Sequence, residues 1–357
     1  MILRVIIKVY FSCLLVNRQW CRNAVPLLWS DIEIHGNKQL LRVCLSVLNA
    51  EEKALLKPFE IILPNNPNRY LNILHILRLF TLVQLMGLEN AQSLAEFLYK
   101  NTALSFLNIS HNQLHSETLK ILVEALCKNT TITSLSLDYN QLNSDEAKSL
   151  AEALYENNTI TSLNICNNQI GSDGGKALAK ALYENTTLTS LSLNYNKLYS
   201  EGGNALAEAL CKNTTLTSLS LGDNSISPEG GKVLARALYK NTTLTHLYLA
   251  NNQLGTEGGK ALAEVFHKNT TLTHLYLGSN ELGIEIGSAF AKALYYNTTL
   301  ISLNLIYNKL NSKVVKTLAE ALHNNITLKS LWLGGNNIDY TTSNEIRKFL
   351  IWNKQIF

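Results

Sequence analysis

The sequence predicts an α/β solenoid, a stack of 28-residue repeats that each contribute one short strand and one helix, preceded by a small helical segment. Three observations support this prediction. An asparagine recurs every 28 residues, a fixed set of leucines surrounds it, and a run of helix-forming residues follows. The recurring asparagines are Asn112, Asn140, Asn168, Asn196, Asn224, Asn252, Asn280, Asn308 and Asn336. Because one unit is too small to bury its own leucines, the units must stack, and each then contacts only its neighbours.

The first part of each repeat follows the pattern L-x-x-L-x-L-x-x-N-x-L, as in Leu216, Leu219, Leu221, Asn224 and Ile226. Leucines at alternate positions indicate a short strand with one buried face. Beyond the strand, the backbone turns inward with amide groups that no ladder can pair. A buried carboxamide, which both donates and accepts, can satisfy them. We therefore expect the recurring asparagines to form a structural ladder and to have no catalytic role.

The second part of each repeat indicates a helix, as in "GGKALAKAL" at residues 174–182. Polar residues at its start are placed to cap the first turn. These residues are Ser144, Ser172, Ser200 and Thr256. Asparagines at its end are expected in the left-handed conformation that often terminates helices. These are Asn185, Asn213, Asn241 and Asn269. Since stacked strands lie about 4.8 Å apart and helices about 10 Å apart, the stack should curve with its strands on the inner side.

The repeats resemble the leucine-rich repeat, in the long variety found in ribonuclease inhibitor and in innate immune receptors. The resemblance covers about three quarters of the chain and implies a right-handed α/β horseshoe over residues 76–357. Residues 76–103 are a degenerate first copy, nine regular copies follow, and the last one acts as a cap. The resemblance implies a monomeric module that recognises a protein partner.

The concave face of such a horseshoe would carry the third, fifth and seventh residues of each copy, because the leucines point inward. This face is mostly small and polar, with aromatic and imidazole groups towards its C-terminal half. The predicted partner-binding residues are His246, Tyr248, His274, Tyr276, Tyr307 and Trp332. Tyrosine and tryptophan are enriched among binding hot spots. The alternative interpretation is that Tyr248 and Tyr276 only stabilise each other as a cross-strand pair.

Residues 1–32 carry a different pattern. The stretch "FSCLLVNRQWCRNAVPLLWSDI", residues 11–32, resembles the second half of an F-box. The matching positions are Leu14, Leu15, Val16, Arg18, Trp20, Leu28 and Trp29. The resemblance implies docking on the Skp-type adaptor of a cullin ubiquitin ligase, with the repeats holding the substrate. The first helix of an F-box, which opens with a Leu-Pro-x-E-like motif, has no counterpart in this sequence.

A second interpretation of this segment is a helical cap that covers the edge of the first repeat, with Trp20 and Trp29 as core residues. Residues 33–75 are predicted to form a connector or N-terminal cap under either interpretation. They contain one expected buried strand, "FEIIL", which ends before Pro64 and Pro67.

The composition argues against several other classes of protein. The 31 lysines and arginines nearly balance 27 acidic residues and form no basic run, which argues against a nucleic-acid partner. No apolar stretch is long enough to span a membrane. The 6 cysteines form no C-x-x-C pair, so we expect reduced thiols and no zinc site. These features predict a cytoplasmic or nuclear protein without a cofactor.

No set of acid, base and nucleophile in the sequence predicts an enzyme. The stretch "LGTEGGKALAE" at residues 254–264 lacks the spacing of a phosphate-binding loop and recurs along the chain. His246 and His274 would stack on adjacent strands, but no third metal ligand accompanies them. A GTPase activator built from similar repeats is a weaker alternative, because Arg236 lies within a predicted outer helix and many activators need a projecting arginine. A scaffold or sensor without any ligase link is the remaining alternative.

Overall fold

The structure, a computed structural model, describes residues 88–101, 104–114 and 116–355. The predictions made for residues 1–75 and for the strand part of the degenerate repeat therefore lie outside the described residues. The chain divides into two compact units, and the boundary between them runs through one helix. The first unit includes residues up to Leu142 and Glu152–Asn168, and the second includes Asn143–Ala151 and all residues from Gln169 onwards.

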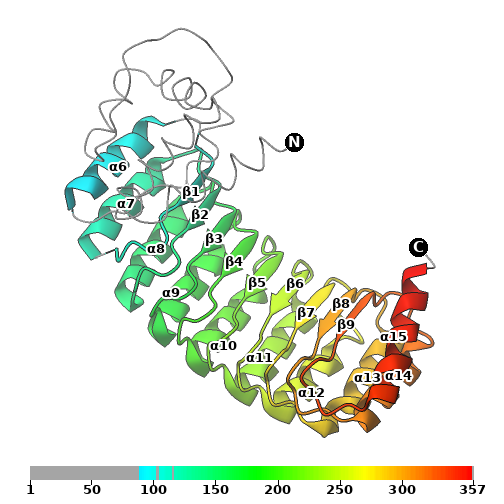
Figure 1. Ribbon diagram of the computed structural model, residues 1–357. Helices are drawn as coiled ribbons and strands as arrows, with labels where there is room; N and C mark the ends of the chain where they lie inside the picture. Colours follow the sequence, from blue (N-terminus) through cyan, green and yellow to red (C-terminus); the bar gives the residue numbers. More distant parts are fainter. Residues whose placement is uncertain (1–87, 102–103, 115, 356–357) are drawn as a thin grey trace, which may run out of the picture. The chain divides into compact units, whose positions relative to one another are not determined.

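Strands and helices alternate along the chain (Figure 1). The strands are β1 (Phe106–Asn108), β2 (Ser134–Ser136), β3 (Ser162–Asn164), β4 (Ser190–Ser192), β5 (Ser218–Ser220), β6 (His246–Tyr248), β7 (His274–Tyr276), β8 (Ser302–Asn304) and β9 (Ser330–Trp332). The helices are α6 (Leu88–Lys100), α7 (Ser116–Lys128), α8 (Ser144–Glu156), α9 (Gly171–Glu184), α10 (Tyr199–Leu210), α11 (Ser227–Lys240), α12 (Gly255–Val265), the short 3-10 helix η2 (Ile284–Ile286), α13 (Gly287–Tyr296), α14 (Ser312–Leu322) and α15 (Tyr340–Gln355). This order confirms the predicted repeat of one strand and one helix.

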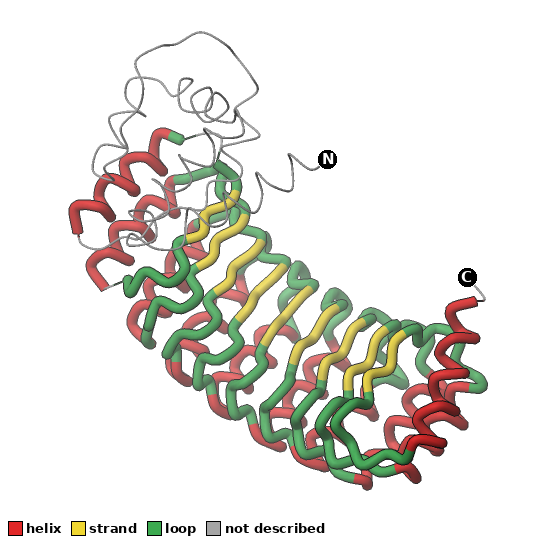
Figure 2. The backbone as a smooth tube through the Cα atoms, viewed as in Figure 1, coloured by secondary structure: helices red, strands yellow, loops and turns green. Residues whose placement is uncertain are grey.

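Neighbouring strands within each unit are parallel, and each residue pairs with the residue 28 positions later. Leu219 of β5, for example, pairs with Leu247 of β6. The strands line one side of each unit and the helices line the other (Figure 2). Because the register equals the repeat length, every position of a repeat lies beside its equivalent in the next repeat.

The core of each unit lies between its strands and its helices. In the repeat of β5, the leucines at 216, 219 and 221 and Ile226 are all fully buried. The helix that precedes this strand contributes Leu206, Ala207 and Leu210, which are also fully buried. Burying one leucine contributes about 1.5–3 kcal/mol relative to leaving it exposed, so the stacking of repeats supplies the stability that a single repeat lacks.

Adjacent helices approach each other most closely at glycines in their first turns. A Cβ atom added to Gly175 would lie 3.1 Å from the Cα of Gly202, and one added to Gly231 would lie 3.0 Å from the Cα of Gly258. A side chain at either position would force the facing backbone to move by a few tenths of an ångström. The glycine-rich stretch that resembles a phosphate loop thus serves helix packing.

The predicted serine and threonine caps are wrong for three helices. Ser200 and Thr256 are second residues of their helices, and no side chain caps either helix; Ser172 occupies the same place in α9. The amide of the first helical residue instead donates to the next repeat, as Tyr199 N does to Asn224 O at 2.9 Å. Ser200 Oγ donates to the carbonyl oxygen of Ile226 at 2.8 Å. A neighbouring repeat therefore satisfies the groups that a local cap would have satisfied.

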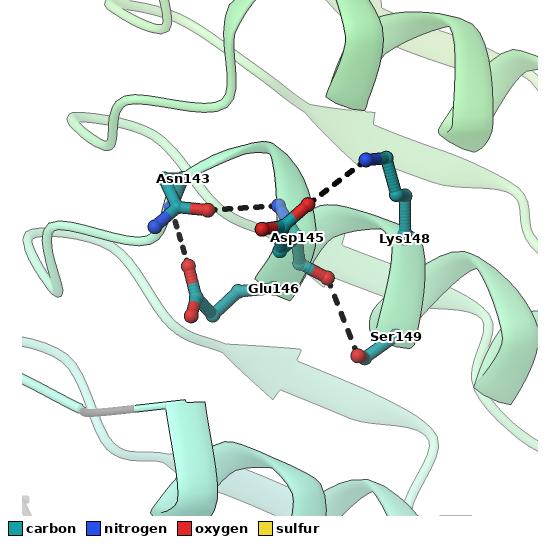
Figure 3. Close-up of polar contacts among 5 residues, drawn as sticks. All are labelled: Asn143, Asp145, Glu146, Lys148 and Ser149. Carbon is teal, nitrogen blue, oxygen red and sulfur yellow. Dashed lines mark hydrogen bonds and ion pairs between the residues drawn. The ribbon is translucent and has the colours of Figure 1, made fainter.

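Helix α8 does have a local cap, although Ser144 does not provide it. Asn143 Oδ1 accepts a hydrogen bond from Asp145 N at 2.8 Å, and Asn143 N donates to Glu146 Oε2 at 2.8 Å (Figure 3). This reciprocal pair is a capping box. Lys148 Nζ adds a 2.8 Å bond to Asp145 Oδ1 on the exposed side of the turn.

The asparagines at the helix ends are extended and not left-handed as predicted. Asn185 has φ −69° and ψ 130°. Its equivalent Asn213 is buried, and Nδ2 donates to Leu182 O at 2.7 Å in the preceding repeat. Asn213 Oδ1 accepts from Leu216 N at 2.8 Å. We call this row of residues the helix-end asparagines, and it ties the end of each helix to the preceding helix and to the following strand.

Candidate protein-binding surface

The asparagines that recur after each strand hold the strands in register. Asn224 is fully buried, and its Nδ2 donates to Leu221 O at 2.9 Å in its own repeat and to Leu193 O at 2.9 Å in the preceding one. Its Oδ1 accepts from Asn196 N at 2.9 Å and from Leu198 N at 3.3 Å. We call this row the strand asparagines. The contacts fix the turn that leaves each strand, and they thereby fix which strand residues face outward.

The outward surface of the sheet in the second unit, here called the strand face, carries the residues on either side of each central leucine. These residues are Ser190, Ser192, Ser218, Ser220, His246, Tyr248, His274, Tyr276, Ser302, Asn304, Ser330 and Trp332. On β6, Leu247 is fully buried, whereas His246 and Tyr248 are half-buried. The strand face is therefore a row of small polar residues that large rings interrupt at β6 and β7.

The rings on β6 and β7 form two parallel stacks. The ring centroids of His246 and His274 lie 4.2 Å apart with an interplanar angle of 9°. Those of Tyr248 and Tyr276 lie 4.5 Å apart, also at 9°. We call these four residues the aromatic patch. Parallel register causes the stacking, because each ring pairs with its equivalent in the next repeat.

Two side chains of the aromatic patch, His274 and Tyr248, lie in surroundings that disfavour their charged forms. Burial, with a smaller contribution from His246, holds the pKa of His274 below its ordinary value of 6.5. Burial and the neighbouring Tyr276 raise the pKa of Tyr248 above its ordinary value of 10.0. These two side chains can therefore desolvate against a partner without the cost of removing a charge from water.

The other two predicted residues lie apart from the aromatic patch. Trp332 is on β9, pairs in register with Asn304, and is 56% exposed. Tyr307 follows β8, is 64% exposed, and lies against Gly335, where a side chain would collide with its ring. Both rings are available to solvent, but they do not join the two stacks.

Two polar neighbours of the aromatic patch were not predicted from the sequence. Thr245 Oγ1 lies 2.8 Å from His246 Nδ1, and Thr273 Oγ1 lies 2.8 Å from His274 Nδ1. The hexapeptide "LTHLYL" occurs at residues 244–249 and again at residues 272–277. This duplication is the signal that could have identified the threonines.

The described part of the chain gives no support for metal binding, for crossing a membrane or for an arginine that projects from the strand face. No group of three or more His, Cys, Asp or Glu side chains there could hold a metal ion. None of its helices combines the length and the apolar character needed to cross a membrane. Arg236 is exposed on α11, with its guanidinium 3.7 Å from Glu229, so it faces away from the strand face.

The fold and its two rows of asparagines define a class, the leucine-rich-repeat solenoid. Leucine-rich repeats are in general protein-interaction modules and not enzymes, because stacked repeats create extended binding surfaces. The family profile of the leucine-rich repeat matches residues 128–151, 156–179 and 268–291. The profile of the TMOD/LMOD leucine-rich domain matches residues 176–276.

Several solved structures are similar to the chain at low sequence identity. The leucine-rich repeat-containing protein LegL7 from Legionella pneumophila is 23% identical, with a TM-score of 0.46. The similarity covers 72% of this chain and 93% of the LegL7 chain. Actin-binding site 2 of leiomodin-1 is 19% identical over 51% of this chain and 89% of its own, with a TM-score of 0.35. The tropomodulin C-terminal domain of Caenorhabditis elegans is 19% identical over 42% and 92%, with a TM-score of 0.37. No curated protein sequence matches the chain.

Proposed function

We propose that this protein is a recognition module that binds a protein partner on the strand face of its second unit, centred on the aromatic patch. The observation that supports this proposal is the concentration of four stacked rings within a surface of serines and asparagines. An aromatic centre with a small polar surround is typical of a protein interface, where tyrosine and tryptophan carry much of the binding energy.

The stacking of Tyr248 on Tyr276 is compatible with this role. Both residues are half-buried, so each phenol ring keeps an exposed part while its face packs on the other. A cross-strand pair of this kind contributes about 0.2–1 kcal/mol to the fold. It also holds the rings in one geometry before binding, which lowers the entropic cost of the complex.

The experiment uses the purified chain to isolate a binding partner and then measures affinity by titration calorimetry. Tyr248→Ala, Tyr276→Ala or Trp332→Ala should weaken binding by about 2 kcal/mol or more in at least one case. Ser192→Ala is the matched control on β4 and should bind like the parent. Parent-like binding by all four variants would show that the partner uses another surface.

We further propose that residues 1–32 link this module to a ubiquitin ligase, so that the bound partner is a substrate for ubiquitination in the cytoplasm or nucleus. The F-box-like positions support this proposal, and they lie outside the described residues. A pull-down with a purified Skp-type adaptor should retain the chain and should lose it with Trp20→Ala. Failure to retain the chain, or retention that survives the substitution, would favour a scaffold without a ligase link.

A further inference from the structure

Thr245 and Thr273, which lie beside the aromatic patch, each donate the hydroxyl proton in a hydrogen bond to a backbone carbonyl oxygen. Thr245 Oγ1 donates to Thr217 O at 2.9 Å, and Thr273 Oγ1 donates to Thr245 O at 3.0 Å. Thr161 Oγ1 makes the same bond to Thr133 O at 3.1 Å in a repeat where serine replaces the histidine. The bond is therefore a property of the repeat and does not depend on the histidine.

These hydrogen bonds determine the tautomer of His246 and His274. A hydroxyl has one proton to donate, and in Thr245 and Thr273 that proton goes to a carbonyl oxygen. The imidazole nitrogens at 2.8 Å, His246 Nδ1 and His274 Nδ1, must therefore be the donors in their contacts with the hydroxyls. In a neutral imidazole that carries its proton on Nδ1, Nε2 keeps a lone pair and acts as an acceptor.

Both lone pairs are open to solvent. Among the side chains that the structure describes, Asn204 Oδ1 is the single buried nitrogen or oxygen atom without a hydrogen-bond partner. Within the same residues, the Nε2 atoms of His246 and His274 have no hydrogen-bond partner, so neither atom can be buried. The strand face therefore presents two unoccupied acceptors side by side, on parallel rings with centroids 4.2 Å apart.

Among the described strand residues that flank the two histidines, none is a lysine or an arginine that would repel a positive ligand. The flanking side chains on the strand face are Ser218 and Ser220 on β5, Tyr248 on β6, Tyr276 on β7, and Ser302 and Asn304 on β8. None of these is charged at neutral pH. The turn after β5 carries a carboxylate, Asp223, which accepts a hydrogen bond from Asn251. His246 is the one titratable neighbour that shifts the pKa of His274, and both burial and this neighbour oppose its protonation.

Two adjacent acceptors on parallel rings suit a planar donor with parallel N–H groups. A metal ion would require the two lone pairs to converge. The ring planes are at 9° to each other and each Nδ1 contacts the equivalent threonine of its repeat, so the two lone pairs point in similar directions. An ammonium group is a compact point charge, whereas a guanidinium group is a flat fork whose N–H bonds can reach two neighbouring acceptors at once. Guanidinium groups also pack well against aromatic rings such as the two tyrosines that follow on the same strands.

We propose that His246 and His274 form an acceptor pair for the guanidinium group of an arginine side chain in a protein partner. This inference rests on the proposed function for the existence of such a partner. The threonines act as positioning residues, because they hold each Nδ1 proton and keep each Nε2 available.

The proposal implies that binding weakens as the pH falls. Protonation turns Nε2 from an acceptor into a donor and adds a positive charge that repels the guanidinium group. Because burial and the neighbouring His246 hold the pKa of His274 below its ordinary value of 6.5, binding should be intact at neutral pH and should be lost only in more acidic solution.

The test uses the full chain with isotope-labelled histidines and the probe N-acetyl-arginine amide. At about pH 8, nitrogen NMR shifts should show the Nδ1–H tautomer for His246 and His274, and the probe should shift both Nε2 signals in a saturable manner. N-acetyl-citrulline amide has nearly the same shape without the charge. It should bind about tenfold more weakly or worse, because charge-assisted hydrogen bonds are roughly twice as strong as neutral ones. An Nε2–H tautomer, or equal responses to the two probes, would overturn the proposal.

Variants separate this proposal from a purely structural role of the rings. His274→Phe keeps an aromatic ring in the stack and should abolish the response. Thr273→Val should allow both neutral tautomers of His274 and should weaken binding of the arginine probe without unfolding the chain. His111→Phe is the control, because His111 stacks on Tyr139 with ring centroids 4.3 Å apart but has no second imidazole beside it. A full response in His274→Phe would contradict the acceptor pair.

Failure of the acceptor pair can also be distinguished from failure of the proposed function. If the arginine probe fails while Tyr276→Ala still weakens a protein partner, only the acceptor pair is wrong. If the probe binds while substitutions on the strand face leave partner binding unchanged, the acceptor pair exists but the partner binds elsewhere.

Discussion

Replacing Asn224 with leucine tests the strand asparagines directly. Leucine has the same number of side-chain heavy atoms with the same branching at Cγ, so the change removes polar contacts without creating a cavity. Asn224 Oδ1 accepts from the amides of Asn196 and Leu198, and both amides would lose this acceptor in a fully buried setting. The loss of Asn224 Nδ2 has a smaller effect on Leu221 O, because this carbonyl oxygen also accepts a hydrogen bond from Asn252 Nδ2 at 2.8 Å.

The expected loss of stability follows from these contacts. Leaving a buried amide unpaired costs about 1–3 kcal/mol, so two amides give about 2–6 kcal/mol in total. Urea unfolding followed by circular dichroism should show a lower midpoint for Asn224→Leu. The matched control is Asn336→Leu in the last repeat, where the side chain is only half-buried and water can reach the released groups. If Asn224→Leu melts like the parent, the strand asparagines do not stabilise the stack and the reasoning fails.

Two further predictions concern packing and pH. Gly231→Ala would normally favour a helix, but here the new Cβ would lie 3.0 Å from the Cα of Gly258. We expect it to lower the free energy of unfolding by about 1–3 kcal/mol, and a stabilised variant in urea melts would show that α11 and α12 separate easily. Hydrogen bonds from Ser312 and from the amide and hydroxyl of Thr342 hold the pKa of Asp339 well below its ordinary value of 3.8. The ionised Asp339 therefore stabilises the chain above about pH 4, the unfolded value, and this contribution is lost as the pH falls towards the folded pKa. Thermal melts of Asp339→Asn and the parent should differ at neutral pH and converge in acid, and a difference independent of pH would exclude this assignment.

The sequence was sufficient for the features that depend on the period of the repeat. The 28-residue spacing places Leu219 beside Leu247 and also places His246 beside His274. The alternation of leucines indicates which strand residues face outward. These features follow from local pattern and stacking alone, so no distant contact had to be known.

The sequence was insufficient where a neighbouring repeat replaces a local interaction. Ser200 was expected to cap a helix, but the first amide of that helix bonds to Asn224 O in the next repeat. Asn185 was expected in the left-handed region, but the helix-end asparagines extend so that their carboxamides reach the preceding helix. The proton on His246 Nδ1 likewise depends on a hydroxyl bonded to another repeat. Each of these details is determined by contacts between repeats.

The helix-end asparagines have a consequence for the covalent modification of the chain. Each one begins an Asn-x-Thr triplet, the acceptor sequence for N-linked glycosylation. The residues are Asn129, Asn157, Asn185, Asn213, Asn241, Asn269, Asn297 and Asn325. In the folded chain they are between 2% and 7% exposed, and the nitrogen that would carry the sugar, such as Asn213 Nδ2, is bonded to a helix carbonyl oxygen. A glycan on this nitrogen would have to occupy the space between adjacent helices, so the folded stack is incompatible with a sugar at these positions.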